Sequence, residues 1–221
     1  MLRPLTRWLC PTMPPSRFDL ILFDLDGVIL DSRTNMDRAW RAVQSEHGLA
    51  TPFEEYFAEI GRPFADIMAR LGLADRASAI ETTFRRSSTE TIGQTAFFDG
   101  MSDVLARISA SSVKVGIVTS KDEIRAKLVL ERLDCKLDII LTPRSDLRGK
   151  PAPDALLYAM ALLHTDPAHT IFIGDMASDH EAAKRAGIAY GHVDWGYGDP
   201  ANDDCRRLQN PQELLTLLGL E

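Results

Sequence analysis

The feature that most limits how this chain can fold is a series of five short apolar runs, each followed by polar residues. They lie at 18–23, 113–118, 137–141, 170–173 and 189–193. Runs of this length are typical of strands that are buried on both faces of a parallel sheet. Helical patterns fill the intervals between the later runs, at 100–111, 122–133, 153–163 and 179–186. Strands that alternate with helices predict an α/β fold with a doubly wound, Rossmann-like parallel sheet.

One interval does not follow this alternation. Between Leu30 and about Thr95 no strand pattern occurs, while helical periodicity recurs at 35–47, 52–60, 64–71 and 77–92. Turn residues at Gly48, Gly61 and Gly72 separate these stretches, as in a small helical bundle. We therefore expect an all-helical cap at residues 34–95, inserted after the first strand of a core that comprises residues 18–33 and 96–221. Residues 1–17 hold four prolines, which disfavour a targeting helix, and are expected to form a flexible tail.

Composition excludes several classes of protein. Hydrophobic residues make up 45% and charged residues 26% of the 221 residues, as in ordinary globular domains. The net charge of -7 argues against a nucleic-acid partner, which requires a basic face. No apolar run approaches the roughly 18 residues of a membrane span, so no membrane partner is expected. Three cysteines without metal-ligand spacing fit a reduced compartment. We expect a cytoplasmic protein, a monomer or homodimer, whose partner is a small molecule.

Polar side chains follow the predicted strands at the edge of the sheet where ligands bind in this fold class. They are Asp24 and Asp26 after the first run, Thr119 and Ser120 after the second, Asp175 and Asp179 after the fourth, and Lys150 in a loop before a helix. Carboxylates that crowd together repel one another and raise their pKa values, so a cation is expected to hold them ionised. Oxygen ligands of this kind suit Mg²⁺ together with a substrate phosphate.

The same set of residues suits phosphoryl transfer. The Lys150 ammonium and the Thr119 hydroxyl are expected to donate hydrogen bonds to phosphoryl oxygens, and the backbone N–H groups after Asp24 and at Ser120 to hold the others. An aspartate in such a position can act as a nucleophile that forms an aspartyl-phosphate intermediate. The predicted partner is therefore a small phosphorylated metabolite.

The position of Asp26 requires a turn. Strict strand geometry would place Asp26 on the same face as Asp24, two residues earlier. A turn at Gly27 would let Asp26 approach the leaving-group oxygen from the other side of the phosphorus, so Gly27 belongs to the predicted phosphate-binding set. Asp26 is then placed to act first as a general acid and afterwards as a general base.

Four motifs, in order along most of the chain, resemble those of the haloacid dehalogenase superfamily of hydrolases. They read Asp24-Leu25-Asp26-Gly27-Val28, Thr119-Ser120, Gly149-Lys150-Pro151 and Gly174-Asp175-Met176-Ala177-Ser178-Asp179. The resemblance implies that Asp24 is the nucleophile and that Asp26 is the general acid and base. It implies Mg²⁺ bound by the Asp24 carboxylate, the Asp26 backbone carbonyl and Asp175, with Asp179 supporting the metal's waters. The helical insertion is similar to the cap of phosphoglycolate phosphatase-like members.

The residues also distinguish branches of that family. The dehalogenase branch needs no metal and lacks the second aspartate of the first motif, so Asp26 and Asp175 argue against it. The phosphonatase branch uses a cap lysine, whereas the first lysine of this chain is Lys114. We therefore expect a phosphatase that hydrolyses a small phosphomonoester, with a phosphomutase of the β-phosphoglucomutase type as the alternative.

Substrate specificity is expected to come from arginines of the cap side. Arg62 and Arg33 are the candidates, because a guanidinium can hold a carboxylate or a second phosphate. Two non-enzymatic alternatives remain. A phospho-receiver domain combines similar residues, but in a different strand order and without a helical insertion of this length. A catalytically silent scaffold would have no need to retain Asp24, Asp26, Lys150 and Asp175 together.

Overall fold

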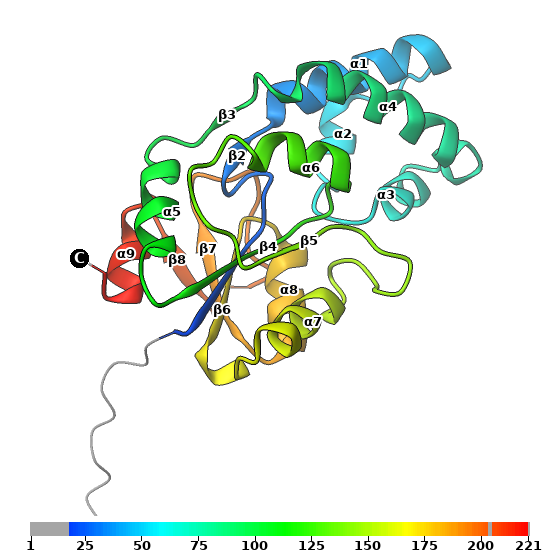
Figure 1. Cartoon of the computed structure of the whole chain (residues 1–221). Coiled ribbons are helices and arrows are strands. Elements are labelled where there is room, and N and C mark those ends of the chain that lie inside the picture. The colour runs from blue at the N-terminus through cyan, green and yellow to red at the C-terminus, as the bar shows by residue number, and fades with distance from the viewer. Residues whose placement is uncertain (1–17, 203–204, 221) are drawn as a thin grey trace, which may run out of the picture.

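A six-stranded parallel sheet forms the centre of the molecule (Figure 1). The computed structural model describes residues 18–202 and 205–220. The strand order is β5-β4-β1-β6-β7-β8, with β1 at Leu20–Phe23, β4 at Lys114–Val118, β5 at Ile139–Leu141, β6 at Thr170–Gly174, β7 at Ala189–Val193 and β8 at Arg206–Leu208. All neighbouring strands pair in parallel. The predicted fold class is confirmed. Only β8 was not predicted among these strands, because a stretch with two arginines and one leucine shows no apolar run.

Helices cover both faces of this sheet. One face carries α5 (Met101–Ser109), α6 (Glu123–Leu130) and α9 (Glu213–Leu218), and the other carries α7 (Asp154–Leu163) and α8 (Ala177–Ala186). Ile21 and Phe23 of β1 pack into the first hydrophobic cluster, while Leu20 and Leu22 pack into the second. This alternation explains why the β1 run is apolar throughout. None of the described helices combines the length and the apolar character that a membrane span requires.

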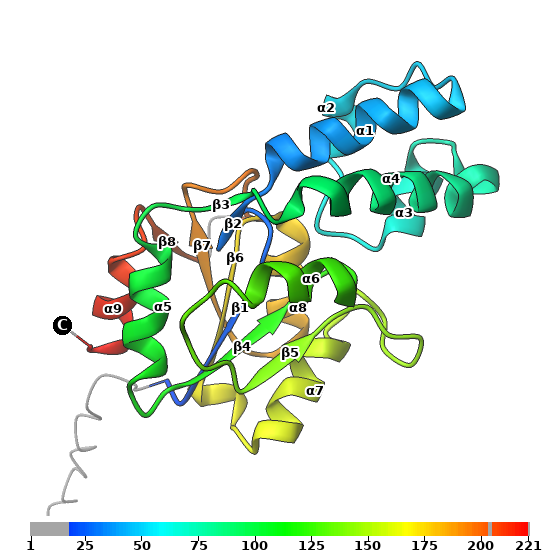
Figure 2. The same ribbon diagram turned by 45° about the horizontal axis from the view of Figure 1, so that its top comes forward.

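Four further helices form a separate layer beyond one end of the sheet (Figures 1 and 2). They are α1 (Arg33–His47), α2 (Phe53–Phe57), α3 (Phe64–Arg70) and α4 (Ala77–Ile92), and we call them the cap. Their own hydrophobic cluster includes Trp40, which stacks on Tyr56 with ring centroids 4.5 Å apart. The helical insertion is therefore present.

The chain enters the cap through β2 (Leu30–Asp31) and leaves it through β3 (Ala96–Phe97), and these two short strands pair antiparallel. Neither strand was predicted, because each is only two residues long. The division of the chain into residues 18–33, 34–95 and 96–221 stays a prediction. The predicted tail at 1–17 lies outside the described residues.

Candidate active site

Three buried carboxylates meet at the carboxyl ends of β1 and β6. Asp24 directly follows β1, Asp175 directly follows β6, and Asp179 lies in the first turn of α8. Each offers a carboxylate oxygen within 4.8 Å of the others. The side chain of Asp179 also accepts hydrogen bonds from the backbone N–H groups of Asp175 (3.3 Å) and Met176 (3.0 Å), which holds the turn between strand and helix.

Lys150 provides a positive charge inside this cluster. Its Nζ lies 2.9 Å from Oδ1 of Asp24 and 2.6 Å from Oδ1 of Asp179, and the side chain is buried. Burial alone would lower the pKa of Lys150, but Asp179 and Asp24 together raise it above its ordinary value. Lys150 is therefore a fixed cation at the edge of the site.

One lysine does not offset the repulsion among three carboxylates. Burial raises the pKa of Asp24 to about 7, although Lys150 acts in the opposite direction. Burial and the charge of Asp179 raise the pKa of Asp175 well above its ordinary value. Within the described chain, Oδ1 of Asp175 is buried without a hydrogen-bond partner. An oxygen-lined site with an excess of negative charge and an unsatisfied carboxylate oxygen fits Mg²⁺.

The first motif turns sharply after Asp24. Gly27 has a φ of 85°, and its N–H donates to the carbonyl of Leu30 at 3.0 Å, so this donor is used within the turn. A Cβ at Gly27 would lie 2.0 Å from Oδ2 of Asp175. The turn therefore needs glycine both for its backbone conformation and for the space that Asp175 occupies.

Asp26 has a different partner, Lys121. The Nζ of Lys121 lies 3.0 Å from Oδ1 of Asp26, and its side chain is only 2% exposed. Burial lowers the pKa of Lys121, and the Asp26 carboxylate opposes this effect. The sequence analysis did not single out Lys121. Its position directly after Thr119 and Ser120, at the end of a buried strand, was the available signal.

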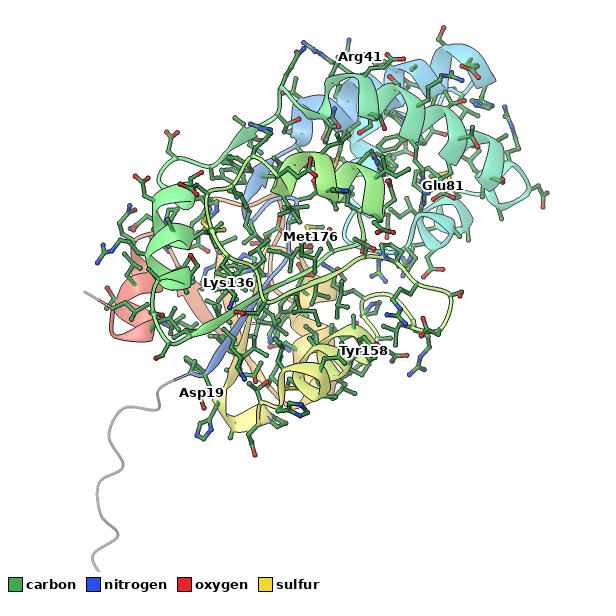
Figure 3. All side chains as sticks on the ribbon, in the orientation of Figure 1. Asp19, Arg41, Glu81, Lys136, Tyr158 and Met176 are labelled. Atoms are coloured by element: carbon green, nitrogen blue, oxygen red, sulfur yellow. The ribbon has the colours of Figure 1, made fainter. Side chains whose placement is uncertain are left out.

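A pocket lies between the cap and the core above these residues. The core side contributes Asp24, Asp26, Thr119, Ser120, Lys121 and Arg125, and the cap side contributes Arg62, Glu81, Arg85 and the aromatic rings of Tyr56, Phe64 and Phe84. Figure 3 shows Met176, which also lines the pocket, near the junction of the two layers and Glu81 on the cap. The hydroxyl of Ser120 donates to the carbonyl of Gly61 at 2.9 Å, so the loop that carries Arg62 touches the core directly.

Residues 21–193 match the sequence profile of the haloacid dehalogenase-like hydrolase family. The chain belongs to this family. A plasmid-encoded phosphoglycolate phosphatase of Cupriavidus necator is 30% identical over 81% of this chain and 82% of its own length. An N-acetylmuramic acid 6-phosphate phosphatase of Pseudomonas aeruginosa is 27% identical over 93% of this chain and 97% of its own. The solved structure of a haloacid dehalogenase-like family hydrolase from Streptococcus pneumoniae superposes with a TM-score of 0.78 at 24% identity, covering 90% of this chain and 97% of that one.

The pocket of this hydrolase includes one of the two predicted specificity arginines. Arg62 lines the pocket, with Nε 3.3 Å from Oε2 of Glu59. Arg33 is not among the described residues that line it. The Arg33 guanidinium instead pairs with Glu54 at 2.8 Å and lies 4.2 Å from the ring centroid of Phe57, both on α2. The role predicted for Arg33 stays a prediction, and helical periodicity alone did not reveal that α2 would offer it these partners.

A loop after β7 also supports the site of the hydrolase. The N–H of Tyr197 donates to Oδ2 of Asp175 at 2.8 Å, and a Cβ at Gly196 would lie 2.2 Å from Cβ of Asp175. The ring of Tyr197 contacts Phe57 of the cap, with centroids 5.0 Å apart. The sequence analysis did not single out this segment, because a backbone N–H donor is available from any residue other than proline.

Replacing Gly27 with alanine is expected to destabilise the hydrolase and to abolish its activity. Gly48→Ala is the matched control, because Gly48 also has a positive φ, 61°, but open space around the added methyl group. A left-handed conformation costs about 1 to 2 kcal/mol for a non-glycine residue. The clash with Asp175 adds about 1 to 3 kcal/mol. Urea unfolding of both variants measures the difference, and equal losses of stability would contradict the role given to Gly27.

Proposed function

We propose that this hydrolase cleaves a small phosphomonoester through an aspartyl-phosphate formed on Asp24. One observation carries the proposal: the Asp24 carboxylate is buried at the base of the pocket, with Lys150 at 2.9 Å and the Asp175 and Asp179 carboxylates within 4.8 Å. The curated relatives described above are named as phosphatases of small phosphorylated compounds. The comparisons give no support to the phosphomutase alternative.

The first step is attack on phosphorus. An Asp24 oxygen forms a bond to phosphorus while the ester P–O bond breaks, and Asp26 donates a proton to the departing oxygen. Lys150 and the Thr119 hydroxyl donate to the phosphoryl oxygens and offset the charge that develops on them. In the second step Asp26 removes a proton from water, the water oxygen bonds to phosphorus, and the bond to Asp24 breaks. Inorganic phosphate is released and Asp24 is regenerated.

Mg²⁺ is the cation proposed for this site. Asp24, Asp175 and the backbone carbonyl of Asp26 would hold it, and Asp179 would orient its waters. When bound, Mg²⁺ would neutralise the carboxylates and polarise the phosphoryl oxygens. The cap would cover the pocket during the reaction and exclude bulk water. A cytoplasmic location and a monomeric or homodimeric state complete the proposal.

Phosphate release from a panel of small phosphomonoesters tests the proposed function. The panel includes p-nitrophenyl phosphate, hexose 1- and 6-phosphates and carboxylated phosphates, each assayed with Mg²⁺ and with a chelator. We expect release that requires Mg²⁺ and a ranking among the natural esters. If a folded, Mg²⁺-loaded protein releases no phosphate from any ester of the panel, the proposal is overturned. An isomerised sugar phosphate without free phosphate would indicate a mutase.

Lys121→Met is expected to slow the hydrolysis of alkyl phosphates by about 10-fold to 100-fold, a part of what a general acid contributes. Lys121 holds the Asp26 carboxylate at 3.0 Å, and without it the proton donor loses its fixed position. The kcat/KM for p-nitrophenyl phosphate, which reports only the steps up to departure of the leaving group, should be affected much less, because this leaving group needs no proton. Lys127→Met, an exposed lysine on α6, is the control. An equal loss of kcat/KM on both esters would contradict a role for Lys121 in positioning Asp26 as the proton donor.

A further inference from the structure

Two arginines from opposite layers meet in the pocket, away from the carboxylates that would hold the metal. Arg85 lies on the cap helix α4 and Arg125 on the core helix α6. Both line the pocket, and both approach the same carboxylate oxygen, Oδ2 of Asp122, with Nε distances of 3.8 Å for Arg85 and 2.5 Å for Arg125. A single carboxylate of the core therefore lies between two guanidinium groups.

Arg125 has hydrogen-bond donors that no acceptor of the described chain uses. Its side chain is 9% exposed, and its guanidinium lies 5.5 Å from the ring centroid of Phe84. Its hydrogen bonds within the described chain use the backbone N–H and Nε, both donating to Asp122, and leave the two Nη groups without acceptors. These Nη groups are not among the buried polar atoms that lack a partner, so they are accessible where Arg125 lines the pocket and can donate to oxygen atoms of a ligand there.

Arg85 has one further partner, Glu81 at 2.5 Å, which also lines the pocket. Lys121 is held by Asp26, and Arg62 by Glu59. Near Arg85 and Arg125, the facing carboxylates are Glu81 and Asp122. Asp122 is the helix cap of α6 and already accepts from the backbone N–H of Arg125. Glu81 and Asp122 balance the charge of the two guanidiniums, but the Nη donors of Arg125 remain available for an additional oxyanion in the pocket.

We propose that the substrate carries a second anionic group, a carboxylate or a phosphate, and that Arg85 and Arg125 bind it. This proposal rests on the proposed phosphatase function. Arginine forks match both kinds of oxyanion, and charge-assisted hydrogen bonds are about twice as strong as neutral ones. The part of the substrate between the two anionic groups would lie against Tyr56, Phe64 and Phe84. Because one arginine belongs to the cap and the other to the core, the bound anion also holds the two layers together.

The test uses substrates that differ only at the end remote from the ester. Propyl phosphate, 2-carboxyethyl phosphate and 1,3-propanediol bisphosphate form one matched set, and longer chains extend it. The wild-type protein is expected to show a kcat/KM at least about 10-fold higher for a carboxylated or bisphosphorylated member than for the alkyl phosphate, the factor of one good charge-assisted contact. Whichever of these two members has the higher kcat/KM identifies the bound anion as a carboxylate or a phosphate. Equal kcat/KM for all members at every chain length would overturn the proposal.

Arg85→Met and Arg125→Met are expected to lower kcat/KM for the anionic members by at least about 10-fold more than for the alkyl phosphate and so to remove this preference. Arg86→Met is the matched control, because Arg86 neighbours Arg85 on α4, pairs with Glu46 and does not line the pocket within the described chain. Arg85 is 46% exposed, so its variant should fold even if that of the buried Arg125 does not. Equal losses on anionic and alkyl substrates in Arg85→Met would overturn the proposal.

Binding measurements separate this proposal from the proposed function. Calorimetric titration of an Asp24→Asn protein with the same compounds needs no turnover. The anion site is supported if the anionic member binds more tightly than the alkyl phosphate and if Arg85→Met abolishes this difference. This holds even if no compound in the panel is hydrolysed. Equal binding of anionic and alkyl members overturns the anion site, even if hydrolysis occurs.

Discussion

Asp24→Asn is expected to lower phosphate release by at least about 1,000-fold, the scale seen when a nucleophile is removed. Asparagine has nearly the same size, but its amide oxygen is too weak a nucleophile to attack phosphorus. The loss should be the same for p-nitrophenyl phosphate and for the best natural ester, because both need the aspartyl-phosphate. Phosphate release with saturating Mg²⁺ measures the effect, and Asp37→Asn on α1 is the control, since Asp37 pairs with Arg41 and does not line the pocket in the described chain.

The variant should lose activity without losing its fold. Burial raises the pKa of Asp24 to about 7, which means that the folded protein disfavours the ionised form. Replacing this carboxylate with a neutral amide relieves repulsion with Asp175 and Asp179, while Lys150 keeps Asp179 as a partner at 2.6 Å. The melting temperature of metal-free Asp24→Asn should therefore equal or exceed that of the wild type. Substantial activity in a folded Asp24→Asn protein would show that another group is the nucleophile.

Most of the residues that the sequence analysis brought together directly follow a buried strand or lie at the start of the next helix. Asp24 ends the β1 run, Thr119 ends the β4 run and Asp175 ends the β6 run. Parallel strands place these ends at one edge of the sheet, so local patterns were sufficient to predict that these residues converge. Lys150 was found through its motif, although its contacts with Asp24 and Asp179 depend on how the loop before α7 folds over the sheet.

Some of the residues that were missed depend on how the cap lies against the core. Arg85 and Arg125 meet because α4 approaches α6, and neither helical pattern carries information about that approach. The contacts of Arg33 with α2 were missed for the same reason, since periodicity does not fix how α1 is rotated relative to its neighbours. Tyr197 acts on Asp175 through a backbone N–H, which any residue other than proline could supply.

Mg²⁺ is expected to stabilise the protein, and more strongly above pH 7 than below it. The folded-state pKa of Asp24 is about 7, compared with an ordinary value of 3.8. Between these values the metal-free folded protein holds a proton that the unfolded chain has released, so its free energy of unfolding falls as the pH rises through this window. Above pH 7 this penalty is fully present, and Mg²⁺ binds without displacing a proton. Below pH 7 the proton and the metal compete for the same carboxylate.

Asp175→Asn is expected to remove most of this stabilisation together with the phosphatase activity. The substitution takes away a carboxylate whose pKa is raised by burial and by Asp179, and with it the oxygen that lacks a hydrogen-bond partner in the described chain. At 100 times its dissociation constant, Mg²⁺ adds about 2.7 kcal/mol to the free energy of unfolding of a protein with one site. Thermal unfolding at several Mg²⁺ concentrations, on both sides of pH 7, measures this contribution for the wild type, Asp175→Asn and Asp37→Asn.

A Mg²⁺ effect that is independent of pH in the wild type, or that persists in Asp175→Asn, would mean that the ion binds elsewhere. The three carboxylates would then rely on protons and Lys150 alone to limit their repulsion, and metal-free Asp175→Asn would exceed the wild type in stability by a larger margin above pH 7 than below it.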